Sequence, residues 1–292
     1  MNSADPLRLV VVDWLILTLP GIIWGASFLF IAEGLRAIGP NGVTFVRILV
    51  GFMTLAALPS SRRALPRSDW WAVALLGVVW MAFPLSMFPF AEQRVSSALT
   101  GMLNGAVPLF AALVAWIMTR RPPCSATVVG LAVGLLGAVL MAAPSLQEGR
   151  STAVGVLLIL AALVSYGFAI NLARPLQQRH GALPVIWKAQ AVALVLTAPL
   201  GVPELLQAHW TTGPLLALLA LGVLGTGVAY VLITMAAGRV GSTRAAATTF
   251  LIPPVALLLG VLVRGERVAL VSIVGAAICV AGAWLVNRAR SA

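Results

Sequence analysis

The chain has 292 residues, of which 61% are hydrophobic and only 9% are charged. A soluble globular protein carries about 25% charged residues, so a water-soluble fold of this composition would lack the polar groups that its surface needs. The net charge of +11 does not indicate a nucleic-acid partner, because the chain has no basic run with interleaved aromatic residues. The composition therefore predicts a protein that lies in the lipid bilayer.

Apolar runs separated by charged residues or by Pro and Gly predict ten helices. In the first half of the chain these are residues 14–34, 41–58, 70–89, 97–118 and 126–143. In the second half they are residues 153–173, 184–201, 212–236, 244–263 and 269–286. Lipid offers no partner to an unpaired backbone group, so these runs are expected to be helices. The predicted fold class is an all-α integral membrane protein.

The basic residues predict which helix ends face the cytoplasm. If the N-terminus is cytoplasmic, twelve of them fall in inside loops and tails and five in outside loops, while Arg47 and Lys188 lie within helices. Basic residues gather in cytoplasmic loops. We therefore expect a multi-pass protein of the bacterial inner membrane with both termini in the cytoplasm.

The sequence repeats itself at a spacing of 145 residues. AEQRVSSALTGMLNGAVPLFAAL, residues 91–113, aligns without gaps with AAGRVGSTRAAATTFLIPPVALL, residues 236–258. The same spacing continues through the neighbouring helices, where Leu76-Gly77-Val78 meets Leu221-Gly222-Val223. A constant offset across three helices argues against chance. The chain is therefore predicted to consist of two repeats, residues 1–150 and 151–292.

Each repeat contains five predicted helices. Because five is odd, the second repeat enters the membrane from the side opposite to the first. Inverted repeats are typical of secondary transporters, which bind solutes near the membrane midplane between the repeats. The expected architecture is ten transmembrane helices in two inverted five-helix repeats that form one bundle.

Small residues line one face of the fifth and tenth predicted helices. They are Gly130, Gly134 and Gly137 in the former and Gly275, Cys279 and Gly282 in the latter. Such spacing allows two helix backbones to approach closely. Each of these two helices is expected to pack closely against a neighbour and to lie away from the substrate cavity.

Three stretches carry a resemblance to a known family. GIIWGASFLF, at residues 21–30, and RILVG, which starts at Arg47, come from the first half. PPVALLLGVLVRGERV, at residues 253–268, comes from the second half and holds Glu266 in a Gly-Glu-Arg sequence. These stretches resemble the Trp-Gly opening, the arginine-led second helix and the closing segment of EamA domains in the drug/metabolite transporter (DMT) superfamily.

The resemblance implies a tandem EamA transporter with ten helices. Members carry amino acids, metabolites, drugs or sugar derivatives, usually outward, and we favour the branch of YddG-type bacterial amino-acid exporters. The halves depart from strict equivalence, because Arg121 replaces an expected Glu and Tyr166-Gly167 replaces Trp-Gly. A family likeness does not determine the substrate.

Pro108 and Pro253 occupy the same position in the two repeats, near the middle of a predicted helix. Proline lacks an N–H and leaves the carbonyl four residues earlier without its helical partner. The freed carbonyls belong to Asn104 and Thr249, which also have polar side chains. These groups could accept the ammonium of a bound solute, or the prolines could only kink the helices for packing. The two prolines are expected to approach each other near the membrane centre.

Four aromatic residues lie deep in predicted helices, namely Trp24, Trp80, Tyr166 and Tyr230. A buried phenol needs a hydrogen-bond partner. These rings either pack in the core or line an amphipathic cavity that holds the side chain of a solute. Thr226 stands four residues before Tyr230, so the two are expected to face the bundle interior on one stripe of the eighth helix.

Arg47 and Lys188 sit inside corresponding helices of the two repeats. A charge at a helix centre costs roughly 2.5–3.5 kcal/mol on insertion scales. Either side chain could snorkel to the head groups, contact a substrate carboxylate or act as a gate charge, and Glu33 is a conjectural partner for Arg47. Arg94 and Arg239 correspond in the repeats and are interpreted as loop anchors or opposing gates.

No carboxylate lies near the centre of a predicted helix, which favours a facilitator or an exchanger over a carboxylate proton relay. The chain also lacks HExxH, GxSxG and Walker sequences, and its two histidines, His180 and His209, fall on opposite sides of the membrane. We expect no enzyme, no catalytic residue, no metal and no cofactor. The expected partners are a small-molecule substrate and the lipid bilayer, with no nucleic acid, and the protein is expected to be a monomer.

The sequence favours an inner-membrane exporter of small amphipathic solutes, above all amino acids including aromatic ones, that works by alternating access. Its central cavity is expected between helices one, three, four, six, eight and nine. The predicted substrate-binding residues are Trp24, Trp80, Asn104, Pro108, Tyr166, Tyr230, Thr249 and Pro253. An exporter of cationic drugs or other metabolites stays as one alternative, and a non-transporting membrane scaffold as another.

Overall fold

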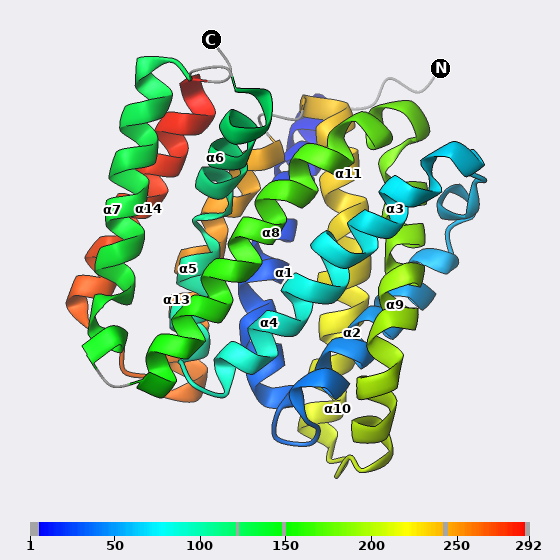
Figure 1. Cartoon of the computed structure of the whole chain (residues 1–292), viewed down its shortest axis with the longest axis horizontal. Coiled ribbons are helices and arrows are strands. Elements are labelled where there is room, and N and C mark those ends of the chain that lie inside the picture. Colours follow the sequence, from blue (N-terminus) through cyan, green and yellow to red (C-terminus); the bar gives the residue numbers. More distant parts are fainter. Residues whose placement is uncertain (1–5, 121–122, 148–149, 242–244, 290–292) are drawn as a thin grey trace.

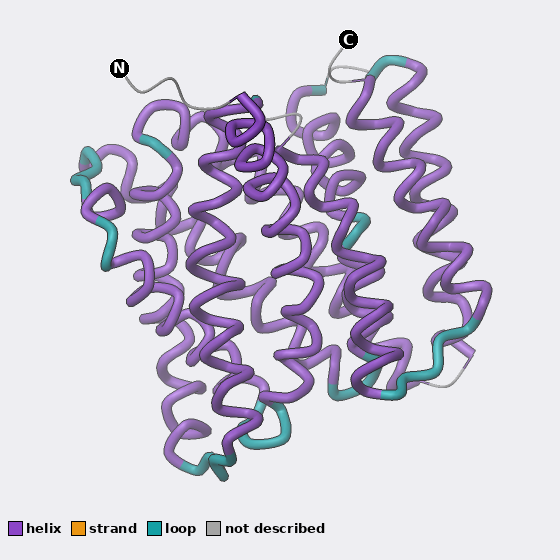
Figure 2. Tube along the Cα trace, turned by 180° about the vertical axis from the view of Figure 1, so that it is seen from behind, coloured by secondary structure: helices purple, strands orange, loops and turns teal. Residues whose placement is uncertain are grey.

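The computed structural model describes residues 6–120, 123–147, 150–241 and 245–289. Helices account for nearly all of these residues, and no strand occurs among them (Figure 2). Eight helical segments in the described part are long and apolar enough to cross a membrane, and the bent pair α5 (Ser97–Asn104) and α6 (Val107–Thr119) makes a ninth. The all-α membrane fold is thus confirmed, while a count of ten depends on α2 (Pro40–Ala56), an apolar helix of only 17 residues.

The elements follow the predicted order. Those of the first half are α1 (Pro6–Gly34), α2, η1 (Pro59–Arg62), η2 (Arg67–Asp69), α3 (Trp70–Leu76), the π-helix η3 (Gly77–Ala82), α4 (Phe83–Glu92), α5, α6 and α7 (Ser125–Gln147). Those of the second half are α8 (Arg150–His180), α9 (Ala182–Leu206), α10 (Thr212–Ala220), the π-helix η4 (Leu221–Val228), α11 (Ala229–Val240), the 3₁₀ helix η5 (Ala247–Leu251), α13 (Ile252–Arg264) and α14 (Leu270–Ala289).

The departures from regular α-helix fall at matching places in the two halves. The π-helix η3 begins at Gly77, and Gly222, 145 residues later, lies in the π-helix η4. The chain bends by 42° between α5 and α6, just before Pro108, and it forms the 3₁₀ helix η5 just before Pro253. Proline explains this second pair, because its ring prevents a regular helix from continuing toward its N-terminal side. The repeat therefore extends to the helix defects.

The helices α7 and α14 lie side by side and run antiparallel (Figure 1). Ser272, early in α14, donates a hydrogen bond of 2.8 Å to the carbonyl of Met141, late in α7. At the other end, Gly282 lies against the backbone of Gly130 and Gly134. A Cβ placed on Gly275 would lie only 2.7 Å from the carbonyl oxygen of Gly137. The predicted close packing of the glycine faces is confirmed.

A second antiparallel pair is formed by α2 and α9. Glu204, near the end of α9, accepts hydrogen bonds of 2.7 Å from the Asn41 side chain and from the Gly42 backbone at the start of α2. Lys188, near the start of α9, donates to the carbonyl of Arg63, beyond the end of α2. The helix α5 also packs against α13, which corresponds to α6, so the broken fourth and ninth predicted helices of the two halves are in contact. Antiparallel contact between corresponding helices is the arrangement that an inverted repeat requires.

The centre of the bundle is occupied by α1 and α8. The helix α1 packs against η4, α11 and α13, and α8 packs against the corresponding η3, α4 and α6. Fully buried side chains such as Ile31 and Ile159 fill this interior. Large apolar side chains cover the outside, including Leu206 with 81% and Leu262 with 71% of its surface exposed. Only a lipid environment accommodates so much exposed apolar surface.

Candidate functional site

Three of the four predicted deep aromatic residues touch one another. The ring of Tyr230, on α11, meets the rings of Trp24 on α1 and of Trp80 in η3 edge to face, with centroids 5.7 Å apart in both pairs. Tyr166, on α8, lies 6.0 Å from Phe88 of α4. Edge-to-face contacts at such distances are favourable. The fold thus brings buried and half-buried aromatic side chains from both halves together, and we call this group the aromatic layer (Trp24, Trp80, Phe88, Tyr166 and Tyr230).

Arg47 lies beside the aromatic layer and is only 6% exposed. Its Nε donates a hydrogen bond of 2.9 Å to Oγ1 of Thr226, in η4. Its Nη2 also lies close to Gly225, whose carbonyl accepts the hydrogen bond of Trp24 Nε1. The side chain therefore points into the bundle, and snorkelling to the head groups is excluded for this arginine.

The conjectured pairing of Glu33 with Arg47 is wrong. Glu33 instead forms ion pairs with Arg36, at 3.0 Å, and with Arg264, at 4.0 Å. These partners lie at helix ends, where the three side chains remain accessible to solvent and are less costly to ionise than a pair inside the membrane.

Backbone carbonyl groups of the two π-helices accept hydrogen bonds from side chains of neighbouring helices. Trp24 Nε1 donates to the carbonyl of Gly225 at 3.0 Å, and Gln190 Nε2, from α9, donates to that of Thr226 at 2.8 Å. In the other half, Ser165 Oγ donates to the carbonyl of Val79 in η3 at 2.7 Å. Single π-turns inside α-helices occur frequently at functional sites. The sequence analysis missed Ser165 and Gln190, although a polar residue within an apolar run is the signal that would have found them.

The predicted proline-associated residues form a second group, where the two helix breaks meet. Pro253 packs so closely on Gly105 that a Cβ there would collide with the proline ring. This contact lies three residues from Pro108, in agreement with the expected approach of the two prolines. Asn104 is 9% exposed, and its buried Oδ1 accepts no hydrogen bond within the described part of the chain. Thr249, in contrast, uses its hydroxyl within its own turn, on the carbonyl of Ala246. The prediction that Pro253 frees the carbonyl of Thr249 is wrong, because the N–H of Ile252 donates to that carbonyl in the tighter 3₁₀ turn.

The three other predicted charges have different surroundings. Lys188 is buried, donates to the carbonyl of Arg63 and lies over the ring of Trp187. Arg239 of α11 pairs with Asp13 of α1 at 2.7 Å, which joins the two halves at one end of the bundle. Arg94, in the turn after α4, donates to the carbonyl of Phe90 in that helix and packs near Gly155 at the start of α8.

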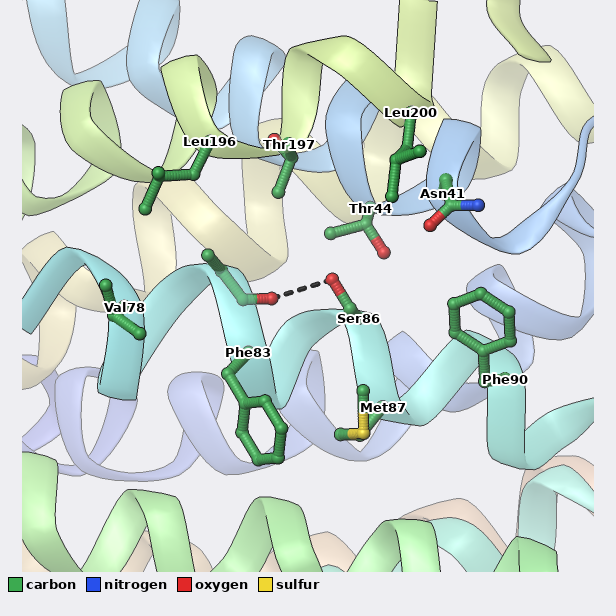
Figure 3. A pocket seen from close by; sticks show the side chains of 11 residues that line it. Asn41, Thr44, Val78, Phe83, Ser86, Met87, Phe90, Leu196, Thr197 and Leu200 are labelled. Atoms are coloured by element: carbon green, nitrogen blue, oxygen red, sulfur yellow. Dashed lines mark hydrogen bonds between the residues drawn. The ribbon is translucent and has the colours of Figure 1, made fainter. Parts of the chain in front are cut away.

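A cavity of about 420 Å³ lies between α2, α9 and the η3–α4 segment (Figure 3). Its hydroxyl groups are already used by carbonyls of their own helices, as Figure 3 shows for Ser86 and the carbonyl of Ala82, 2.7 Å apart. Phe83 and Leu200, at its edge, are exposed on the lipid-facing surface. None of the eight predicted substrate residues lines this cavity.

A smaller cavity of about 210 Å³ lies where α4, α7 and α13 end and α5, α8 and α14 begin. We call it the end cavity, and its lining is mostly polar. Its lining residues are Glu92, Gln93, Arg94, Val95, Ser96, Leu99, Pro144, Thr152, Arg267, Val268, Ala269 and Ser272.

Together, the fold and the buried polar groups define a multi-pass membrane protein whose two antiparallel halves enclose an aromatic and charged layer. Within the described residues, no group of three or more His, Cys, Asp or Glu side chains could hold a metal ion. A layer of this kind, near discontinuous helices, is where secondary transporters bind solutes.

Comparison with known proteins identifies the family. The model of the EamA-like transporter family matches residues 13–143 and 153–288, so the chain belongs to this family and contains two tandem copies of its domain. Family members are transporters, which does not suggest an enzyme. Their place in a lipid bilayer and their small-molecule substrates agree with the apolar surface and the buried layer of this chain.

Several curated proteins are similar over nearly the whole chain. A probable terminal-alkyne amino-acid exporter of Streptantibioticus cattleyicolor is 28% identical, and the match covers 93% of this chain and 92% of the exporter. The uncharacterized transporter YdfC of Bacillus subtilis is 26% identical, with 89% and 86% covered. A crystal structure of a protein superimposes with a TM-score of 0.64 at 17% identity over 96% of each chain, which shows the fold alone.

Proposed function

We propose that this protein is a secondary transporter of the bacterial inner membrane that exports small amphipathic solutes, most of all amino acids, by alternating access. The observation that supports this proposal most is the burial of Arg47 beside the aromatic layer. A single site then offers both a positive charge and apolar rings to a solute. An amino acid has the complementary groups, a carboxylate and, in many cases, an apolar side chain. The similarity to an amino-acid exporter supports this choice.

Each end of the solute has a proposed partner. Arg47 contacts the carboxylate, since a guanidinium matches carboxylate geometry. The side chain lies among Trp24, Trp80, Tyr166 and Tyr230. The ammonium is accepted by Asn104 Oδ1, which is buried and has no donor among the described residues, together with the helix breaks beside Pro108 and Pro253. Thr249 has a weaker claim, because its hydroxyl already has an acceptor.

Alternating access requires the two halves, residues 1–150 and 151–292, to move against each other. Ion pairs join the halves at both ends of the bundle, Asp13 with Arg239 at one end and Glu33 with Arg264 at the other. We propose that these pairs open alternately as gates, with Arg94 and Lys188 holding the neighbouring loops. Both termini face the cytoplasm in this arrangement, as the basic residues indicate.

A transporter dedicated to cationic drugs fits the site less well. Aromatic rings attract cations, but the buried charge beside them is the positive charge of Arg47. A cation would therefore enter against like-charge repulsion in a medium of low dielectric constant.

The proposal is tested with purified protein in liposomes loaded with radiolabelled phenylalanine, leucine, glucose or tetraphenylphosphonium. We expect efflux of the amino acids, and a lower efflux rate for Tyr230→Ala and Asn104→Ala with unchanged folding. Trp71→Ala is the matched control, because Trp71 is 68% exposed on the outer surface. Absence of efflux for all four solutes would refute the proposed function, and unchanged amino-acid efflux in both variants would remove these residues from the site.

A further inference from the structure

Glu92 is the last residue of α4, and both oxygens of its carboxylate are buried without a hydrogen-bond donor among the described residues. Buried polar groups are nearly always hydrogen-bonded, and an ionised carboxylate buried without a partner is costly. Two half-buried glutamates differ from Glu92. Glu204 accepts two hydrogen bonds at the start of α2, and Glu266 accepts three at the start of α5. Glu92 therefore lacks the structural role that these two carboxylates have.

Several charged side chains surround Glu92, and most of them form hydrogen bonds or ion pairs with other residues. Arg47 of α2 donates to Thr226, and Arg264 of α13 pairs with Glu33 and Glu266. Glu266, in the loop after α13, adds a negative charge nearby. On the end cavity, Arg94 donates to the carbonyl of Phe90, and Arg267 is exposed. No ion pair to Glu92 occurs in the described part of the chain. Whether the Glu92 carboxyl group binds a proton therefore depends on the charges around it and not on one fixed partner.

The end cavity gives Glu92 a route to the aqueous phase. Glu92 is one of its lining residues, and arginine, serine, threonine and glutamine side chains form much of the rest. A polar cavity of this kind can hold water beside the Glu92 side chain while the membrane interior stays dry. The two carboxylate oxygens are themselves shielded in this state, so a proton reaches them only when the cavity wall opens slightly. With the proposed orientation this end faces the outer medium.

Arg47 connects Glu92 to the aromatic layer. Its charge acts on Glu92, and its Nη2 lies close to Gly225, whose carbonyl accepts the hydrogen bond of Trp24 Nε1. A change of charge on Glu92 therefore alters the potential at the proposed solute site, because electrostatic interactions are weakly screened inside a membrane protein. Proton binding and solute binding are linked through this potential.

From these observations we infer that Glu92 is the proton-carrying group of the transporter and that export is driven by proton antiport. The inference rests on the proposed function. A proton from the outer medium forms an O–H bond with the Glu92 carboxylate, which removes the negative charge that favours the ammonium of the solute, and the solute leaves outward. After the change of access the O–H bond breaks, the proton enters the cytoplasm, and the restored charge favours the next solute. No oxidation or other co-reactant is involved.

The test compares wild-type protein with Glu92→Gln in liposomes loaded with radiolabelled phenylalanine. Efflux is measured with an acidic outer medium and at equal pH, and phenylalanine exchange is measured with the solute on both sides. We expect the pH gradient to accelerate wild-type efflux and to change the signal of a pH dye inside the liposomes. Glu92→Gln is expected to lose the acceleration and the dye response completely while it retains exchange, with a lower affinity for phenylalanine because the charge that favours the ammonium is absent.

Glu204→Gln is the matched control, because it removes the charge of a half-buried glutamate that has hydrogen-bond donors. This variant is expected to keep the response to the gradient. Glu92→Asp, which keeps a carboxyl group, is expected to restore the response and guards against a folding defect in Glu92→Gln. A gradient response retained by Glu92→Gln, or wild-type efflux that ignores the gradient, would overturn the inference and leave the proposed function intact. A wild-type protein that moves no solute under any condition would instead refute the proposed function.

Discussion

At the scale of single residues, the glutamates of this protein are distinguished by their hydrogen-bond partners more than by how far they are buried. Glu266 accepts hydrogen bonds from the backbone of Ser97, the hydroxyl of Ser97 and the backbone of Ala98, at 3.1, 2.7 and 2.8 Å. A carboxylate at a helix start also interacts favourably with the helix dipole. The glutamate of the Gly-Glu-Arg sequence thus joins the α13–α14 loop of one half to α5 of the other.

Replacement of Glu266 by Ala is expected to destabilise the protein strongly. A hydrogen bond to a charged group contributes about 1.5–3 kcal/mol, and three are lost together. We expect a clear fall in the melting temperature in detergent. Glu33→Ala is the control, because exposed ion pairs contribute about 0–1 kcal/mol and Arg36, a partner of Glu33, has a side chain that is 69% exposed. An equal fall for both variants would contradict this interpretation.

The sequence was sufficient to single out Arg47 and the deep aromatic residues, because a charged or aromatic residue inside an apolar run can be recognised from the sequence alone. It was not sufficient to find their partners. The hydrogen bond from Arg47 to Thr226 joins residues 179 positions apart, and the isolation of Glu92 is a property of what packs around it. Glu92 looked like a residue of a helix end, where solvent would normally reach it.

At the scale of elements, the glycine faces of α7 and α14 allow contact between backbones. In a bilayer, helices gain little from the hydrophobic effect when they associate, so close van der Waals packing is needed to hold them together. The pair stands at one edge of the bundle (Figure 1), where it packs against α5, α6 and α8.

Gly275→Val is expected to separate these two helices. A Cβ at this position would lie 2.6 Å from the backbone nitrogen of Met141, and overpacking typically costs about 1–3 kcal/mol. The expected result is a lower yield of monodisperse protein and a lower melting temperature, with efflux per folded molecule preserved. Ala277→Val, on the exposed side of the same helix, should be tolerated. If it were as damaging as Gly275→Val, the close glycine contact would not be the cause.

The apolar runs predicted the helices well but not their defects. Pro108 and Pro253 indicated two of the irregular positions, because proline acts on its own helix. The π-turns of η3 and η4 could not be predicted, since their carbonyls are stabilised by Ser165, Trp24 and Gln190 from other helices. Such turns are a consequence of tertiary packing.

At the scale of the whole molecule, the proposed orientation can be read from the two free cysteines. Cys124 precedes α7 and is exposed, whereas Cys279 in α14 is 1% exposed. Because α7 and α14 are antiparallel, Cys124 lies at the end of the bundle where α14 ends. A hydrogen bond with Thr127 lowers the pKa of the Cys124 thiol.

A membrane-impermeant maleimide should therefore label only Cys124, and only from the cytoplasmic side. Labelling is expected in inverted membrane vesicles and not in intact spheroplasts, and Cys124→Ser should abolish it. Since the thiolate is the reactive form, the lowered pKa means that the labelling rate begins to rise at a lower pH than for an ordinary cysteine. Rapid labelling in intact spheroplasts would show the opposite orientation.

The contacts α2 with α9 and α7 with α14 join corresponding helices, and the contact of α5 with α13 joins the corresponding broken helices of the two halves. A shorter ancestor with five helices could have built the same bundle from two identical copies inserted in opposite directions. Such a dimer would have repeated every side chain across its axis. In the present single chain, Arg47 donates to a π-turn while Lys188 donates to a loop carbonyl. Fusion of the two copies thus released the halves from sequence identity and allowed an asymmetric centre, suited to a solute whose two ends differ.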